Sequence, residues 1–390
     1  MIRQNFNADW TVEKGDGNSR MNSFLGNTQT KTVHLPYDAM IHEARTPDTK
    51  NGAQTGFYPG GEYIFQKHFT APQAWQGKPV SLVFEGVYQT ALVYLNGWLL
   101  TRNVNGYAEF TVEAGPYLKY GADNLLKVIA DNSLEPNSRW YTGSGIYRPV
   151  RLLVGNKVYL PQDTVRITTR EADEGFALLD VTAQVQSAST VTERVTLQQT
   201  ICRKGTAVLT DRQNLLLQPG ESRTVSFRYC VDSPALWSPE NPNLYTSTMQ
   251  VLEGEEELDR EETGFGIRTL SIDAAHGVRI NGQTVKLRGA CIHHDNGILG
   301  AATLPDAEER RIRQLKEAGF NAIRSSHHPA GRALLDACDR YGVLVMDELS
   351  DVWNVRKNPY DYALYFEQDW KPTIQKMVAK DYNHPSVILY

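Results

Sequence analysis

Three short segments of the sequence bring ionisable side chains together in a pattern that suits binding or acid–base chemistry. They are His293-His294-Asp295, then Arg324 with His327-His328, then Asp347-Glu348. Histidine and arginine donate hydrogen bonds to hydroxyl or anionic groups, while carboxylates accept from hydroxyls or act as acid and base. We therefore predict that these segments border one polar cleft. Taken singly, each residue is also explained as a solvated loop residue or a helix cap, above all His294 and His328.

The same residues are a weak signal for a metal site. Their histidines stand in adjacent pairs and not as His-x-His on one strand face, so they are poorly spaced to converge on one ion. A serine hydrolase is not indicated, because there is no Gly-x-Ser-x-Gly elbow and residues 142–145 form only a Gly-rich loop. Three aromatic residues of the segment 349–365 could instead stack on the apolar face of a sugar ring: Trp353, Tyr360 and Tyr362.

Strands and helices alternate after about residue 271. Strands are predicted at 286–294, 321–327, 342–348 and 386–390. Three helices are predicted between them. The first begins after Thr303, which is able to cap it, and the three end near Gly319, Gly342 and Asn383. The Val-Leu-Val-Met run of the third strand is apolar on both faces, as is typical of a parallel strand.

These elements place the ionisable segments at the ends of three successive strands. No glycine fingerprint for a dinucleotide and no GxxxxGK[ST] loop occurs, so the repeated units favour a (β/α) barrel over a nucleotide-binding sheet. The active site of such a barrel lies at the C-terminal ends of its strands. Adjacent strand residues point to opposite sides, so each pair should send one member into the cleft.

The first 270 residues are predicted to be all β. Residues 1–155 contain short runs that alternate apolar and polar positions, with a hairpin signal at Asn96-Gly97, and they indicate a β-sandwich or jelly roll. Residues 156–270 hold about seven strands and fit an immunoglobulin-like sandwich. A second Asn-Gly turn, Asn281-Gly282, then predicts a hairpin before the barrel strands.

Composition excludes several classes of protein. The chain has 390 residues, 41% of them hydrophobic and 22% charged, which is ordinary for a globular protein. A net charge of -5 argues against a nucleic-acid binder. No apolar run of about 18 residues is present, so no contact with a membrane is expected. The N-terminus lacks an apolar signal segment, so we expect a cytoplasmic protein or one exported with a signal peptide absent from this chain.

The residues and blocks of this chain resemble glycoside hydrolase family 2, the β-galactosidase and β-glucuronidase family. The resemblance extends over all three predicted regions and keeps the family's order. It is carried by EGVYQTALVYLNG (85–97), GSGIYRPVRL (143–152), LWSPENPNLY (236–245), GFGIRTL (264–270), INGQTVKLRGACIHHD (280–295), FNAIRSSHHP (320–329), CDRYGVLVMDE (338–348) and NHPSVIL (383–389).

The resemblance implies a jelly-roll domain of sugar-binding type at 1–155, an immunoglobulin-like β-sandwich at 156–270, and the first half of a (β/α)8 TIM barrel at 271–390. Only about 120 residues remain for a barrel that typically needs about 250. The family's sugar-site positions map onto barrel residues and onto two residues from the first domain. The predicted substrate-binding residues are His293, Arg324, His327, Asp347, Glu348, Asp351, Trp353, Arg139 and Trp140.

For activity, the resemblance implies hydrolysis of terminal β-glycosidic bonds by a retaining exo-β-glycosidase, a β-galactosidase first and a β-glucuronidase second. Retention needs two carboxylic acids about 5 Å apart. The family supplies both as Glu residues, expected beyond Tyr390, so we assign no catalytic residue here and expect this chain alone to be inactive. The alternative is a carbohydrate-binding or assembly module without catalysis.

The resemblance also sets expectations for ions and partners. The galactosidase branch has an aspartate near the position of Arg139 and a magnesium-binding pattern after its Asp-Glu pair, and neither is visible here. We therefore predict no metal and no cofactor. The expected partner is a β-linked oligosaccharide or glycoside, and the full-length form is expected to be a homo-oligomer.

Overall fold

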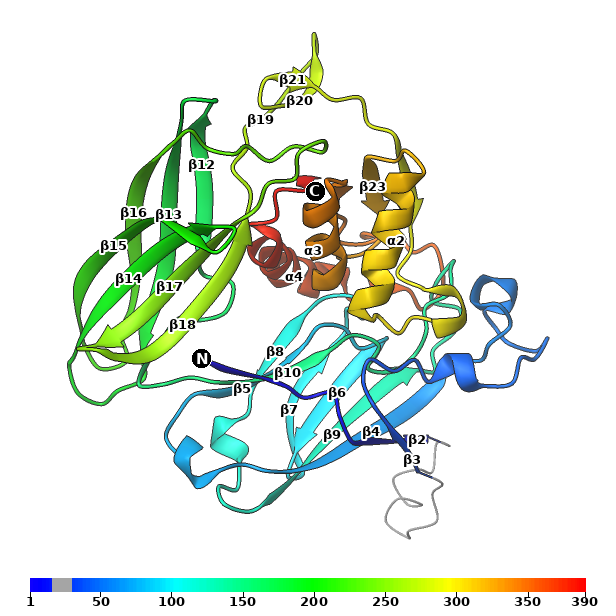
Figure 1. Ribbon diagram of the computed structural model, residues 1–390. Helices are drawn as coiled ribbons and strands as arrows, with labels where there is room; N and C mark the ends of the chain where they lie inside the picture. The colour runs from blue at the N-terminus through cyan, green and yellow to red at the C-terminus, as the bar shows by residue number, and fades with distance from the viewer. Residues whose placement is uncertain (16–29) are drawn as a thin grey trace.

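The computed structural model describes residues 1–15 and 30–390 and arranges them in three consecutive regions (Figure 1). Two antiparallel β regions come first, and a region of alternating strands and helices follows. In Figure 1 this third region, yellow to red, lies above the first region and beside the second. In the described parts of the chain, no helix is both long enough and apolar enough to cross a membrane.

The first region is a sandwich of two sheets. One sheet has the order β1 (Ile2–Asn5), β10 (Val150–Val154), β5 (Val80–Phe84), β8 (Phe110–Glu113). The other has the order β3 (Lys31–Val33), β2 (Trp10–Lys14), β4 (Gly61–Thr70), β9 (Asp123–Asn132), β6 (Thr90–Leu95), β7 (Trp98–Asn103).

Alternating side chains build the core of this sandwich. In β6 buried residues alternate with partly exposed ones, and the buried face packs against residues such as Trp10 and Phe65, which are fully enclosed. The turn between β6 and β7 has positive φ at both Asn96 and Gly97, 52° and 90°, as the predicted type I′ hairpin requires. The connections between the strands contain short 3-10 helices: η1 (Met40–His42), η2 (Gly52–Thr55), η3 (Gln73–Trp75) and η4 (Gly115–Tyr117).

The second region is a sandwich with its own core. In one sheet β13 (Phe176–Ser187) pairs with β11 (Val158–Tyr159), β12 (Arg166–Ala172) and β16 (Ser222–Asp232). The other sheet has the order β15 (Thr206–Leu217), β14 (Glu193–Arg203), β17 (Tyr245–Glu253), β18 (Glu256–Phe265). The core between them is aliphatic and aromatic, with Leu197, Met249 and Phe265 among its members.

The third region begins with a small antiparallel sheet and continues as a parallel one. The small sheet consists of β19 (Leu270–Asp273), β20 (Gly277–Ile280) and β21 (Gln283–Thr284). The parallel strands follow in sequence order: β22 (Gly289–Ile292), β23 (Ala322–Ser325), β24 (Leu344–Met346) and β25 (Val387–Leu389). The helices between them are α2 (Pro305–Glu317), α3 (Arg332–Tyr341) and α4 (Phe366–Asp381). This is the start of a TIM barrel, as the sequence predicted.

The helix ends follow the predicted signals with one exception. Gly319 and Gly342 follow α2 and α3 and have positive φ, 89° and 67°, in the left-handed range that glycine tolerates. Thr303 does not cap α2, contrary to the prediction. The helix begins at Pro305 with Leu304 as the N-cap and no side-chain cap, because Thr303 lies one position too early and its hydroxyl donates to Ala301 O at 3.2 Å.

Buried and partly buried side chains join the third region to both sandwiches. Arg332 at the start of α3 forms ion pairs with Glu109 of the first sandwich, at 2.8 Å, and with Asp163 of the segment before β12, at 2.6 Å. On the other side, Trp237 is fully buried and its Nε1 donates to Asp339 O at 2.9 Å. The Arg332–Glu109 ion pair thus holds the start of α3 against the first sandwich, and the Trp237 hydrogen bond holds the other end of α3 against the second.

Candidate functional site

The C-terminal ends of β22, β23 and β24 carry the three predicted pairs of ionisable residues. Each pair is divided between two environments: His293, His327 and Glu348 are partly exposed, whereas His294, His328 and Asp347 are buried. This division follows from the alternation of side chains about an extended backbone. The partly exposed members gather around one cleft, together with Arg324, and the buried members support it.

The centre of the cleft is a three-residue polar cluster. Arg324 Nε donates to Glu348 Oε1 in a close ion pair, and the other oxygen, Oε2, lies 3.0 Å from His327 Nδ1. Arg324 Nη2 lies 3.3 Å from the same His327 nitrogen. The hydrogen bond to Glu348 raises the pKa of Arg324, so the guanidinium stays charged. The cluster therefore offers a fixed positive group and a carboxylate beside each other.

An indole from the first region lies over the barrel histidines. Trp140 stacks on His293, with ring centroids 5.2 Å apart and planes at 22°, and it meets His327 edge-on at 5.5 Å. Burial is the main cause of a lowered pKa at His293, and the neighbouring His327 adds to it. The result is a flat aromatic surface that leads from the first region to the polar cluster.

Arg139 lies at the rim and bonds to Asp351 of the barrel. Arg139 Nη2 donates to both oxygens of Asp351, at 2.7 and 2.9 Å, and Lys357 Nζ donates to Asp351 Oδ1 at 2.8 Å. Burial favours the neutral acid, but the hydrogen bonds from Lys357 and Arg139 outweigh it and lower the pKa of Asp351. This carboxylate is therefore ionised and occupied by two cations.

The buried members of the histidine pairs form a neutral support beneath the cleft. Burial lowers the pKa of His294 to about 3, and His294 Nε2 lies 2.9 Å from Thr142 O. His328 is stacked on Tyr107 of the first region, with centroids 4.3 Å apart and planes at 17°. Burial also lowers its pKa well below the usual range. Both imidazoles are uncharged and act in packing.

Asp347 was predicted to bind the substrate, but its side chain does not reach the cleft. Its side chain is fully buried, and Oδ1 accepts hydrogen bonds from the backbone of Ala330, at 2.9 Å, and of Glu348, at 3.0 Å. Burial raises the pKa of Asp347, and the adjacent Asp381 raises it further. The physical reason is again alternation, which turns Asp347 inward when Glu348 faces the cleft. Asp347 thus holds the backbone that presents Glu348.

The cleft opens into a pocket with a volume of about 680 Å³. Trp353 lies at its border with 69% of its surface exposed, which leaves a large apolar ring free. The pocket brings together most of the predicted barrel residues with further aromatic ones; its lining includes Arg324, His327, Glu348, Asp351, Trp353, Lys357, Phe366, Trp370 and Tyr390. A polar centre with aromatic walls suits a sugar.

Sequence reasoning missed several residues of the site, among them Lys357 and Tyr107. Lys357 lies in the polar loop already expected near the cleft, so its charge in that loop was the available signal. Tyr107 belongs to the connection between β7 and β8, more than 180 residues before the histidines it touches, and nothing in the local sequence marks it. The roles of the predicted residues in binding a substrate stay predictions.

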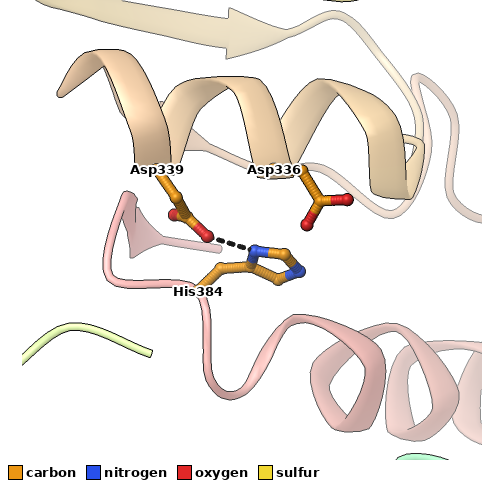
Figure 2. Close-up of side chains that lie close together, drawn as sticks. All are labelled: Asp336, Asp339 and His384. Carbon is orange, nitrogen blue, oxygen red and sulfur yellow. Dashed lines mark hydrogen bonds and ion pairs between the residues drawn. The ribbon is translucent and has the colours of Figure 1, made fainter. Parts of the chain in front are cut away.

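A separate group of potential metal ligands lies at the opposite ends of the strands. Asp336 and Asp339 of α3 and His384, which precedes β25, place one donor atom each within 4.8 Å of one another (Figure 2). His384 Nδ1 lies 2.5 Å from Asp339 Oδ2, and Ser386 N donates to Asp339 Oδ1 at 3.0 Å. Burial lowers the pKa of His384, but the effect of the neighbouring Asp339 is larger, so the pKa is raised. The contacts of Asp339 with His384 and Ser386 join α3 to the segment before β25.

Comparison with known families gives the class of the protein. Three family models match consecutive parts of the chain: "Glycosyl hydrolase 2 galactose-binding domain-like" at 10–176, "Glycosyl hydrolases family 2" at 158–268, and "Glycosyl hydrolases family 2, TIM barrel domain" at 274–390. The three matches follow one another along the chain in the same order as its three regions, two sandwiches and then barrel strands. The chain belongs to glycoside hydrolase family 2.

Individual relatives match the whole of this chain but only part of their own length. The chain is 37% identical to the Beta-galactosidase BoGH2A of Bacteroides ovatus, over 100% of this chain and 46% of that protein. It is 32% identical to a putative beta-glucuronidase of Formosa agariphila, over 100% of this chain and 37% of that protein. A crystal structure of a family 2 member from Bacteroides cellulosilyticus has a TM-score of 0.95 at 37% identity, over 100% of this chain and 51% of that one. The chain thus spans about half the length of these relatives or less.

Proposed function

We propose that the protein containing these residues is a retaining exo-β-glycosidase, a β-galactosidase in the first place and a β-glucuronidase in the second. We also propose that residues 1–390 supply much of its sugar-binding surface and neither of its catalytic carboxylates. The observation that carries the proposal is the convergence of Arg324, His327 and Glu348 with Trp140 at the C-terminal ends of parallel strands.

The aromatic surface of the cleft suits one face of a pyranose. A sugar ring has an apolar C–H face that packs on flat aromatic groups, and Trp140 on His293 offers such a face. Trp353 offers a second, largely exposed ring at the pocket border. The indole of Trp140 is only partly exposed, so it would lose little freedom when a sugar binds.

The polar cluster suits the hydroxyl groups at the edge of the same ring. Glu348 accepts hydrogen bonds, and Arg324 and His327 are beside it to donate them or to hold its charge. Bonds that involve a charged partner are about twice as strong as neutral ones and are directional. A sugar held by an aromatic face and a charged edge has one preferred orientation.

The described carboxylates of the cleft are poorly suited to the two catalytic roles. A retaining enzyme needs one free carboxylate as nucleophile and one carboxylic acid with a raised pKa. Glu348 is held by Arg324 and His327, and Asp351, with a lowered pKa, is held by two cations. The pair of acids is therefore proposed to lie outside residues 1–390.

The choice between sugars rests on the relatives. The relative named a β-galactosidase is 37% identical and the one named a putative β-glucuronidase is 32% identical. This supports galactose first. Arg324 does not select a uronic acid by itself, because its guanidinium is already paired with Glu348.

Chromogenic substrates test the proposal directly. The full-length protein is expected to release nitrophenol from a β-galactoside, or failing that from a β-glucuronide, whereas residues 1–390 alone release none. Turnover by residues 1–390 that is abolished by a substitution of His293 or Glu348 would show that this chain carries its own catalytic groups and would contradict the proposal.

A second candidate is carbohydrate binding without catalysis. It is favoured by the match of residues 10–176 to a model described as galactose-binding domain-like. Calorimetric titration of residues 1–390 with galactose separates the candidates. Binding that survives substitution of Trp140 and Glu348 would support an independent binding role, and its absence would count against it.

A further inference from the structure

Tyr107 is a side chain of the first region that packs against the buried histidines beneath the cleft. It lies between β7 and β8 and is only 9% exposed. Its ring stacks on His328 at 4.3 Å and meets His294 edge-on at 5.0 Å. One tyrosine thus contacts the buried member of both histidine pairs of the barrel.

The hydroxyl of Tyr107 contacts the aromatic surface above. Trp140 Nε1 donates to Tyr107 Oη at 3.0 Å, and the indole then stacks on His293 and meets His327. The partly exposed imidazoles thereby touch the indole that Tyr107 holds. Burial raises the pKa of Tyr107 well above its usual value, so the phenol remains neutral at any physiological pH.

Tyr107 is itself fixed by its backbone. Its N–H donates to Asn105 Oδ1 at 3.0 Å, and its carbonyl accepts from Arg148 Nη1 at 2.8 Å. Arg148 Nη2 donates at the same time to Pro329 O of the barrel, at 3.0 Å. The preceding carbonyl, that of Gly106, accepts from Tyr147 Oη at 3.0 Å. Because its backbone is held in this way, the Tyr107 side chain can hold the side chains that contact it in one position.

We infer that Tyr107 is a positioning residue for the sugar platform formed by Trp140 and His293, an inference that rests on the proposed function. The indole has one polar atom, and Tyr107 is its hydrogen-bond partner. This bond fixes the rotation of the indole about its side-chain torsions. Without it the indole keeps its place between the two regions but loses the orientation that makes it parallel to His293.

The inference is tested with Tyr107→Phe in the full-length protein, which removes the hydroxyl and keeps the ring on His328. The matched control is Tyr245→Phe on β17 of the second sandwich, which keeps a buried ring and removes a hydroxyl that likewise accepts from an N–H, that of Ala235 at 2.8 Å. Both variants are expected to lower the melting temperature by similar amounts. A merely structural role would therefore give the two variants the same kinetics.

The expected kinetic result separates them. Tyr107→Phe raises KM for the nitrophenyl β-glycoside by about threefold to tenfold, the range that one neutral hydrogen bond supplies, and changes kcat less. Tyr245→Phe leaves KM within about twofold of the starting value. In a Trp140→Phe background the effect of Tyr107→Phe on KM disappears, because its partner is gone. Equal KM values for the two tyrosine variants, or an undiminished effect without Trp140, would overturn the inference.

A spectroscopic readout keeps the inference separate from the proposed function. Acrylamide quenching of Trp140 is obtained as the difference between each protein and the same protein with Trp140→Phe. The quenching should rise in Tyr107→Phe and stay unchanged in Tyr245→Phe. If the full-length protein cleaves no β-glycoside, the proposed function fails while quenching still decides the position of Trp140. Unchanged quenching in Tyr107→Phe would overturn the inference even in an active enzyme.

Discussion

Glu348 carries the negative charge at the centre of the cleft, and its neighbours decide its role. It is bonded to Arg324 and His327, while Asp347 beneath it accepts its backbone N–H. The carboxylate is thus held by two side chains and its backbone by a third, which gives it one orientation. A fixed acceptor of this kind suits the recognition of hydroxyl groups.

Glu348→Gln in the full-length enzyme should lower kcat/KM by about tenfold to a hundredfold, the cost of losing one charged hydrogen-bond acceptor. Glutamine keeps the shape but leaves the Arg324 charge without its partner. Steady-state kinetics on the preferred nitrophenyl glycoside measures the effect. The control is Glu309→Gln on α2, a surface residue that forms an ion pair with Arg340 of α3. A Glu348→Gln enzyme as active as the control would remove Glu348 from the site.

His294 should make stability depend on pH. Its pKa is about 3 in the folded protein and about 6.5 when unfolded, so below pH 6.5 the unfolded chain binds a proton that the native state refuses. Stability from this group is complete above pH 6.5. It falls as pH decreases toward 3, by about 1.4 kcal/mol per pH unit.

Urea unfolding between pH 4.5 and 7 measures this dependence. His294→Gln keeps a donor for Thr142 O and should flatten the slope by the contribution of one group, whereas the exposed His34→Gln should not. A slope that is the same in His294→Gln and in the starting protein would show that His294 is protonated in the native state.

At the scale of elements, the sequence predicted the strands because their periodicity is local. The alternation in β6 and the apolar run of β24 can be seen in consecutive residues. Gly319 and Gly342, which have positive φ, mark the ends of two helices. The predicted N-cap of α2 was wrong because the hydroxyl of Thr303 donates to Ala301 O instead, and that hydrogen bond depends on how the loop folds. Local patterns predict elements, whereas caps depend on contacts.

The start of α3 gives a test at the same scale. Arg332 joins Glu109 and Asp163 at 2.8 and 2.6 Å with 21% of its side chain exposed. Arg332→Met removes the cation that joins the two carboxylates. Glu109 keeps a second partner in Arg151, at 3.2 Å, so the change should cost about 3 kcal/mol of unfolding free energy, the lower end for a broken buried ion pair. On the same helix, Arg340→Met breaks an exposed pair with Glu309 and should cost less than about 1 kcal/mol. Urea denaturation compares the two, and equal losses would show that the junction is not a buried ion-pair network.

At the scale of the whole molecule, the site joins two regions that are distant in sequence. Arg139 and Asp351 are 212 positions apart, and Tyr107 meets His328 across a similar distance. The family resemblance predicted the contribution of Arg139 and Trp140, since whole blocks carry it. The partners of those residues depend on how the first sandwich packs on the barrel strands, which no local pattern records. This is why the role of Tyr107 appears only in the folded structure. The alternation that turns one of Asp347 and Glu348 inward is local and could be predicted, whereas which of the two turns inward could not.

The central claim is that these residues belong to a retaining β-glycosidase. The most direct measurement is proton NMR of the full-length protein acting on a nitrophenyl β-galactoside, and on the β-glucuronide if the first is not cleaved, which follows the anomeric signal of the sugar from the first minutes. Retention predicts that the β-anomer of the free sugar appears first and that the α-anomer forms only later, by mutarotation. An α-anomer as the first product, or no cleavage of either glycoside, would contradict it.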